Sequence, residues 1–120
     1  MKSQIKISLF TLLFALFALP AFSQSKAPKV ATIEFKVEGV CGMCKTRIEN
    51  AATIKGVKLA EWDQESSMLR VIYKTKKTNE EAIQQAVADH GHDTDKVKAK
   101  DDAYAKLPGC CAYRDGVEKH

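Results

Sequence analysis

Two cysteines separated by two residues, Cys41 and Cys44, are the residues whose types and spacing are best suited to chemistry. A thiolate is a ligand for soft metal ions and also a nucleophile toward disulfides. Two thiolates on a short loop can supply the low coordination number that Cu(I) and Hg(II) tolerate, whereas Zn(II) usually takes four ligands. The spacing therefore indicates either a soft-metal site, with copper first, or thiol–disulfide chemistry.

The residues on either side predict a strand before the two cysteines and a helix after them. Residues 33–38 alternate apolar and polar side chains, whereas residues 44–52 place their apolar side chains on one side of a helix. Cys44 then lies at or near the first helical position, where unpaired N–H groups and the helix dipole stabilise a thiolate. Lys45 and Arg47 add positive charge nearby.

The first 23 residues have the pattern of a secretory signal peptide. Lys2 and Lys6 precede an apolar run, and Ala21-Phe22-Ser23 has small residues at the positions that a signal peptidase reads. The apolar run is shorter than the roughly 20 residues that span a bilayer, so we expect cleavage near Ser23-Gln24 rather than a membrane anchor. The sequence predicts a periplasmic or secreted protein whose mature chain is not embedded in a membrane.

The rest of the chain is long enough for one small domain. Residues 24–29 are predicted to be a flexible lead-in, residues 30–100 the domain, and residues 101–120 a C-terminal extension. The whole chain of 120 residues has a net charge of only +4. This charge is too weak to suggest a nucleic-acid partner.

The periodicity along the domain predicts alternating strands and helices. Strands are expected at 30–37, 57–63 and 68–74, and a helix from about 44 to 54. A second helix should start at a capping box, Thr78-Asn79-Glu80-Glu81, and end at Gly91. Residues 93–100 alternate weakly and are expected to form a short edge strand. The order β-α-β-β-α-β predicts an α+β, ferredoxin-like sandwich, a four-stranded antiparallel sheet with two helices on one face.

This element order, with the cysteines between the first strand and the first helix, resembles the heavy-metal-associated domain of copper chaperones and periplasmic mercury-binding proteins. The Ile48-Glu49 continuation and Gly91-His92-Asp93 after the second helix add to the resemblance, which covers about residues 30–100. The resemblance implies that Cys41 and Cys44 bind a soft ion, copper first, with mercury or zinc as alternatives. It also implies transfer of the ion rather than enzymatic catalysis, with a metal-transporting membrane protein or another thiol-rich carrier as partner.

Two positions depart from the pattern of the family. Members commonly carry a methionine two residues before the first cysteine, where this chain has Gly39, and here Met43 lies between the cysteines. Many members carry an aromatic residue after the glycine that ends the second helix, where this chain has His92. The family fold places that position close to the thiols, so His92 is a candidate third ligand. The alternative is a solvent-exposed loop histidine, as expected for His90.

The C-terminal extension carries a second pair of cysteines, Cys110 and Cys111. They are expected either to form structural disulfides or to act as a second thiolate pair, which completes the first site or binds metal alone. A full fourth strand would carry the chain about 23 Å away from the first pair, and a helix over residues 101–109 spans only about 14 Å. The two pairs then share no ion, and a four-thiolate site requires that strand to be short or absent.

Thiol–disulfide exchange is the alternative function, because Cys-x-x-Cys at a helix start is also a redox motif. The thioredoxin type of domain requires more elements around the motif than residues 68–100 provide. A third alternative is an adaptor domain whose cysteines are bridged.

Overall fold

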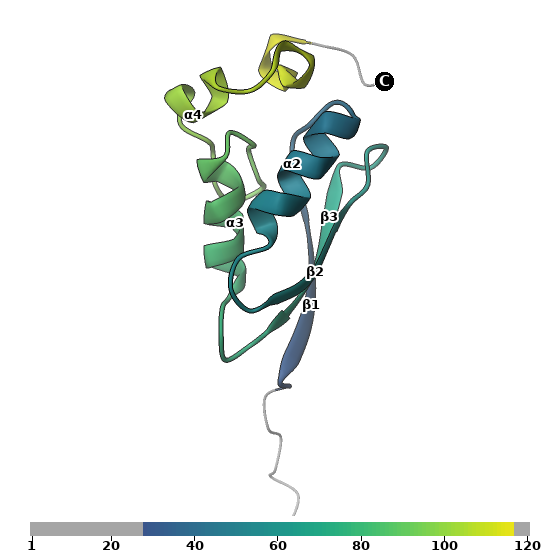
Figure 1. Cartoon of the computed structure of the whole chain (residues 1–120), viewed down its shortest axis with the longest axis vertical. Helices are drawn as coiled ribbons and strands as arrows, with labels where there is room; N and C mark the ends of the chain where they lie inside the picture. The colour runs from purple at the N-terminus through teal and green to yellow at the C-terminus, as the bar shows by residue number, and fades with distance from the viewer. Residues whose placement is uncertain (1–27, 117–120) are drawn as a thin grey trace, which may run out of the picture.

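The computed structural model describes residues 28–116, which form an α+β fold (Figure 1). The predicted signal peptide at 1–23 and most of the lead-in lie outside the described residues. Within the described part of the chain, no helix is both long and apolar enough to cross a membrane. The elements in order are β1 (Val30–Lys36), α2 (Gly42–Ala52), β2 (Val57–Trp62), β3 (Met68–Lys74), α3 (Glu80–Asp89), α4 (Asp101–Ala105) and the short 3₁₀ helices η2 (Gly109–Cys111) and η3 (Tyr113–Asp115).

The sheet is antiparallel and has the order β1-β3-β2. Ile33 of β1 lies opposite Val71 of β3, and Trp62 of β2 lies opposite Leu69 of β3. The predicted hairpin between β2 and β3 is therefore confirmed, and β3 is the central strand.

Helices α2 and α3 lie on one face of this sheet (Figure 1). The alternation in β1 places Phe35 toward the helices and leaves Thr32 and Glu34 exposed on the other face, as the period of two predicted. The core between the layers is formed by Phe35, Val37, Ile48, Ala52, Trp62, Leu69, Val71, Ile83 and Val87.

The predicted fourth strand at 93–100 is wrong: the sheet has three strands among the described residues. A single bridge between Val37 and Thr94 is what remains of it. The Thr94 hydroxyl accepts from the backbone N–H groups two and three residues later, at 3.3 and 3.0 Å, and Asp93 Oδ1 accepts from the Ala99 N–H at 2.7 Å. These local hydrogen bonds satisfy N–H groups that a strand would use for pairing, so the segment folds as a loop.

Both helices begin at positions that differ from the prediction. Helix α2 starts at Gly42, two residues before the expected start at about 44, with Cys41 as its extended N-cap, so Cys44 is the third helical residue and lies in the first turn. The N-cap of α3 is Asn79, whose side chain accepts from the Ala82 N–H, and not Thr78. Asparagine is a better N-cap residue than threonine, which explains why the adjacent position serves.

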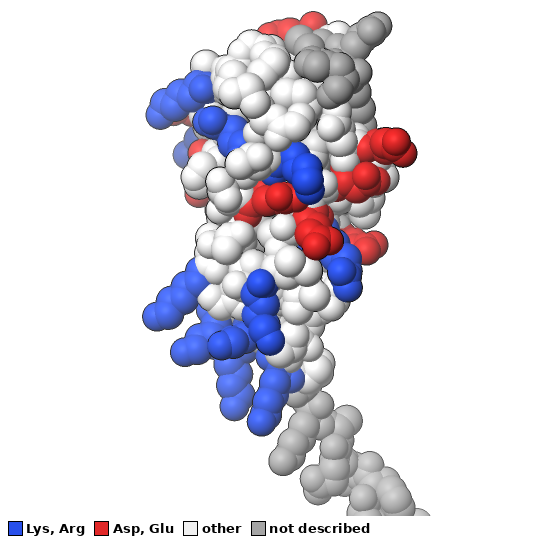
Figure 2. Space-filling model, turned by 45° about the vertical axis from the view of Figure 1, so that its right-hand side comes forward, with Lys and Arg blue, Asp and Glu red and all other residues white. Residues whose placement is uncertain are grey.

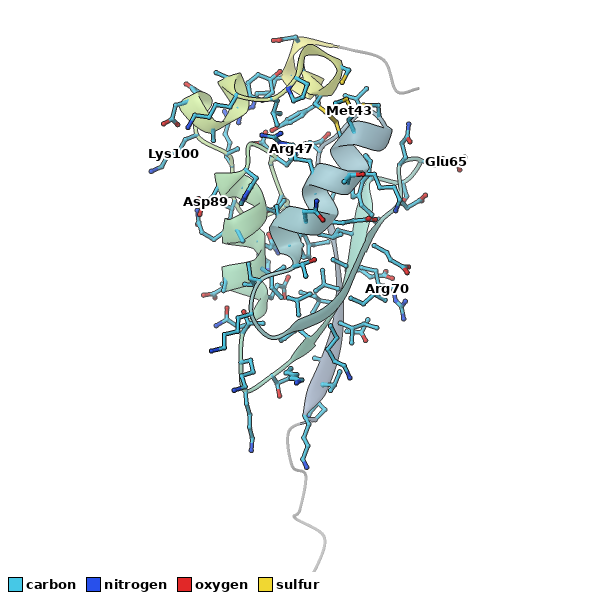
Figure 3. All side chains as sticks on the ribbon, viewed as in Figure 1. Met43, Arg47, Glu65, Arg70, Asp89 and Lys100 are labelled. Atoms are coloured by element: carbon cyan, nitrogen blue, oxygen red, sulfur yellow. A yellow bond between two sulfur atoms is a disulfide. The ribbon has the colours of Figure 1, made fainter. Side chains whose placement is uncertain are left out.

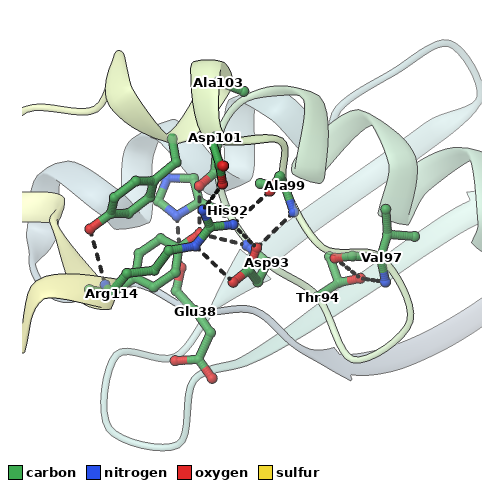
Figure 4. Close-up of polar contacts among 12 residues, drawn as sticks. Glu38, His92, Asp93, Thr94, Val97, Ala99, Asp101, Ala103 and Arg114 are labelled. Carbon is green, nitrogen blue, oxygen red and sulfur yellow. Dashed lines mark hydrogen bonds and ion pairs between the residues drawn. The ribbon is translucent and has the colours of Figure 1, made fainter.

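The segment after the loop returns over the ends of α2 and α3 (Figure 1). Arg114 secures it: the guanidinium donates to Asp93 at 2.7 Å, to the Ala99 carbonyl at 2.6 Å and to Asp101 at 3.2 Å (Figure 4). The Tyr113 hydroxyl donates to the Gly91 carbonyl at 2.6 Å. The short helix α4 predicted before Pro108 is present, and the contacts of Arg114 and Tyr113 hold the tail against the end of α3.

Candidate metal centre

The first pair of cysteines meets at the start of α2. Cys41 is held by the extended N-cap backbone and Cys44 by the first helical turn, and their Sγ atoms lie 3.9 Å apart. With a metal–sulfur bond of about 2.3 Å, two sulfurs are about 4.6 Å apart in linear coordination and about 3.8 to 4.0 Å apart in tetrahedral or trigonal coordination. The separation suits an ion with at least one further ligand.

The tail brings that further sulfur. Cys111 forms a disulfide with Cys44, with their Cα atoms 5.9 Å apart. The sulfurs of Cys41, Cys44 and Cys111 all lie within 4.8 Å of one another. The prediction that the two cysteine pairs stay apart was conditional on a full fourth strand, and that condition is not met. With that strand absent, the chain returns to the thiols.

Cys110 and Met43 extend the group of sulfurs toward the surface. The Cys110 Sγ lies 3.4 Å from the Met43 Sδ, and the Cys110 thiol also donates to the Cys41 sulfur. Met43 is 60% exposed, and Figure 3 shows it at the start of α2, beneath the tail. Five sulfur atoms are thus gathered at one end of the molecule.

The surroundings of Cys41 favour its thiolate. Burial raises the pKa of Cys41. Hydrogen bonds from the backbone of Cys44 and Met43 and from the Cys110 thiol together lower it by more, so the pKa lies below its ordinary value. The pKa of Cys110 moves the other way, because it shares a hydrogen bond with Cys41 and is partly desolvated. Of the two free cysteines among the described residues, Cys41 is therefore the better ligand.

Trp62 supports the cysteine loop from below. A Cβ atom on Gly39 would lie 3.0 Å from both the Trp62 ring and the Ile48 Cδ1. The indole N–H donates to the carbonyls of Val37 and Ser67, both at 3.1 Å, which fixes the ring under the loop. The space that a methionine at position 39 would need is occupied by Trp62 and Ile48, which accounts for this departure from the family pattern.

His92 is buried and not a solvent-exposed loop residue, whereas His90 is exposed as expected. The His92 Nδ1 donates to the Glu38 carbonyl at 2.7 Å (Figure 4). The His92 Nε2 has no hydrogen-bond partner among the described residues. Burial lowers the pKa of His92 to about 4, although the hydrogen bond to Glu38 raises it, so the ring is neutral near pH 7. Among the described residues, the potential ligand atoms that lie within 4.8 Å of one another are the sulfurs of Cys41, Cys44 and Cys111, and His92 is not in this group. Its role as a ligand stays a prediction.

Charged side chains are distributed unevenly between the two ends of the molecule. The end of the molecule opposite the tail carries exposed lysines, and Figure 2 shows them gathered there, with acidic side chains nearer the middle. These lysines are Lys29, Lys55, Lys58, Lys74, Lys76 and Lys77. A groove of about 630 Å³ lies instead beside Met43, and Arg47 and Pro108 also line it.

Sequence reasoning missed the Cys44–Cys111 contact because it placed a strand at 93–100. Two signals in the sequence could have corrected it. The alternation in this segment is weak, and Asp93 and Thr94 are residues whose side chains compete with strand pairing by bonding to nearby backbone.

Comparison with known proteins shows which solved structures this chain resembles. No family model and no curated protein matches the sequence. Among solved structures, the CopZ metallochaperone is 32% identical, with a TM-score of 0.51 over 53% of this chain and 98% of that chain. The N-terminal domain of a potential copper-translocating P-type ATPase from Bacillus subtilis, in its Cu(I)-loaded state, is 28% identical, with a TM-score of 0.51 over 54% of this chain and 84% of that one.

Oxidized MerP from Ralstonia metallidurans CH34 shares the fold, at 24% identity and a TM-score of 0.51 over 54% of this chain and 93% of its own. The chain accordingly belongs to the heavy-metal-associated domain family.

Proposed function

We propose that this chain binds a soft metal ion through Cys41 and Cys44, with Cu(I) first and Hg(II) or Zn(II) as alternatives. The observation that carries the proposal is the pair of buried sulfurs, 3.9 Å apart, at the start of α2. The similar ATPase domain from Bacillus subtilis was solved in its Cu(I)-loaded state, which supports copper.

The protein acts as a carrier or a store of the ion rather than as an enzyme. The relative CopZ is described as a metallochaperone, and other similar domains belong to metal-transporting P-type ATPases. A membrane transporter or another thiol-rich carrier is therefore the proposed partner. The signal-peptide pattern at residues 1–23 supports work in the periplasm or outside the cell.

Binding through Cys44 requires its disulfide with Cys111 to be reduced, because the metal ligand is a thiolate. A dithiol reductant supplies two electrons, breaks the S–S bond and becomes a disulfide itself, which leaves thiols on Cys44 and Cys111. The ion then displaces the thiol protons. Reduced Cys111, held near the other two sulfurs, becomes the third ligand.

Thiol–disulfide exchange is less well supported by the geometry. A Cys-x-x-Cys oxidoreductase forms its disulfide within the motif, whereas here Cys44 pairs with Cys111 and Cys41 stays free. The sulfurs are also shielded, since Cys41 is 5% exposed and Cys44 is fully buried. A nucleophile must reach a substrate disulfide, and these positions hinder such an approach.

The test is Cu(I) binding by the reduced protein in competition with a Cu(I) chelator. Cys41→Ser and Cys44→Ser should each weaken binding by more than the roughly 10- to 100-fold that loss of an outer-shell partner costs. Thr46→Ala, an exposed change on the same helix, is the matched control and should bind as the wild type does.

Circular dichroism checks that the serine variants stay folded, and parallel titrations with Hg(II) and Zn(II) rank the metals. Unchanged Cu(I) affinity in both serine variants would exclude the site. Rapid reduction of insulin disulfides by the wild type would favour the oxidoreductase.

A further inference from the structure

Three sulfurs at the surface end of the centre stay free while the Cys44–Cys111 disulfide is intact. Cys41 and Cys110 are the free cysteines of the described chain, and Cys110 contacts both the Cys41 sulfur and the Met43 thioether. The three come from the N-cap of α2, from its first turn and from η2 in the tail. Tertiary folding brings the cysteine of the tail to the other two residues.

Packing does not explain the position of Met43. Its side chain is 60% exposed, so it fills no gap in the core, which is the usual structural use of methionine. The space under the loop is filled by Trp62 instead. The exposed thioether lies 3.4 Å from the Cys110 thiol, so a widening of this contact by about 0.5 Å would let both sulfurs bind one ion.

We propose that Cys41, Cys110 and Met43 form a Cu(I) site that exists in the disulfide-bonded form of the protein. The proposal rests on the soft-metal function proposed above and deepens it by assigning the oxidised form a site of its own. Cys41 and Cys110 supply two thiolates and Met43 a neutral thioether. Binding of one Cu(I) releases two thiol protons and changes no oxidation state.

This ligand set selects the metal. Thioether sulfur is a soft ligand that suits Cu(I), and three sulfurs satisfy an ion that tolerates low coordination numbers. Zn(II) takes four ligands, almost always thiolate, imidazole or carboxylate, so it gains little from Met43. The oxidised protein should therefore discriminate between Cu(I) and Zn(II) more strongly than the reduced protein, in which Cys44 and Cys111 add thiolates.

An incoming ion can reach the site from the side of Met43, which is exposed, and Cys110, which is half-buried, whereas Cys41 lies deeper. The groove of about 630 Å³ beside α2 is lined by Met43, Arg47 and Pro108, among other residues. Figure 3 shows Met43 and Arg47 along the same helix at this end of the molecule. Two thiolates and one Cu(I) carry a net charge of −1, and the Arg47 guanidinium offers a compensating positive charge at the groove.

The experiment uses the full chain with its disulfide intact, verified by a count of free thiols in denaturant. Anaerobic Cu(I) titration against a chelator should show one bound equivalent, and X-ray absorption at the copper edge should show three sulfur neighbours. Met43→Leu should weaken binding at least about 10-fold and lower the sulfur count to two, whereas Cys110→Ser should abolish the equivalent. Met68→Leu, in β3, is the methionine control and should behave as the wild type does.

Absence of a Cu(I) equivalent in the oxidised wild type, or wild-type affinity in Met43→Leu, would overturn this site. The same variants after reduction separate it from the function proposed above. Tight Cu(I) binding by reduced Met43→Leu shows that the Cys41–Cys44 site stands by itself. Failure of the reduced wild type to bind would refute that function instead.

Discussion

At the scale of single residues, the centre depends on how each polar group is held. His92 is the clearest case, because Nδ1 bonds to a backbone carbonyl and the ring packs against Tyr113, with centroids 5.8 Å apart. A neutral imidazole is required in that position, since an imidazolium would bury a charge with no carboxylate partner for Nε2 among the described residues. His92 therefore makes the stability of the fold sensitive to acid.

We expect the metal-free protein to lose stability as the pH falls from about 6.5 toward about 4, the ordinary and the lowered pKa of His92. In this window the unfolded chain takes up a proton that the folded chain does not, so acid favours unfolding, by roughly 3 kcal/mol over the whole window. Urea unfolding at a series of pH values measures it. In His92→Phe this dependence should flatten, whereas His90→Gln, an exposed change, should keep it. An undiminished slope in His92→Phe would contradict the assignment.

At the scale of elements, the turn after α3 decides where the tail can go. Gly91 has φ of +99°, and a Cβ atom there would lie 2.8 Å from the Ala103 carbonyl oxygen and 3.1 Å from Leu107. Glycine at position 91 therefore allows the left-handed backbone conformation of the turn and also leaves room for α4 to pack closely against it. The loop that follows, in place of a fourth strand, keeps the tail near the sulfurs.

Gly91→Ala should therefore destabilise the protein by more than the left-handed conformation alone costs, which is about 1 to 2 kcal/mol. Gly116→Ala is the matched control, because Gly116 also has a positive φ, +77°, but among the described residues no atom beyond its chain neighbours lies within 4 Å of its Cβ position. Denaturant unfolding should show Gly91→Ala to be the less stable by at least about 1 kcal/mol. Equal stabilities would show that α4 does not pack against this turn.

At the scale of the whole molecule, the disulfide joins the start of α2 to the tail. The match covers 98% of CopZ but only 53% of this chain, so the shared fold in CopZ occupies about half the length of this chain. The cross-link between Cys44 and Cys111 spans a sequence separation of 67 residues. A cross-link over such a separation restricts the unfolded chain strongly and so stabilises the folded state.

Removal of the cross-link by Cys111→Ser should lower the free energy of unfolding by about 4 kcal/mol without loss of the fold. Thermal unfolding and circular dichroism measure the two quantities. Cys110→Ser, at the adjacent position outside the disulfide, should cost far less, and reduced wild type should resemble Cys111→Ser. Identical melting temperatures for oxidised wild type and Cys111→Ser would contradict the cross-link.

Cu(I) should raise the melting temperature of the reduced wild type, since an ion bound only to the folded state stabilises it.

The sequence by itself determined the elements and the first pair of ligands. Alternation in β1, the apolar stripes of α2 and α3 and the hairpin between β2 and β3 are local patterns, and local patterns depend on side chains close together in the chain. The place of Cys41 and Cys44 between the first strand and the first helix is local in the same sense. Family membership and the candidate site could therefore be predicted.

Only the tertiary structure decided what surrounds that pair. The path of the tail depends on whether residues 93–100 pair with β1, and this is a balance between local hydrogen bonds at Asp93 and Thr94 and a ladder with a distant strand. The burial of His92 and the meeting of Cys110 with Met43 follow from that path. Contacts between residues far apart in sequence leave no periodic signal in either segment, because each segment alone is compatible with several partners. The folded chain selects one of them by packing and hydrogen bonding together.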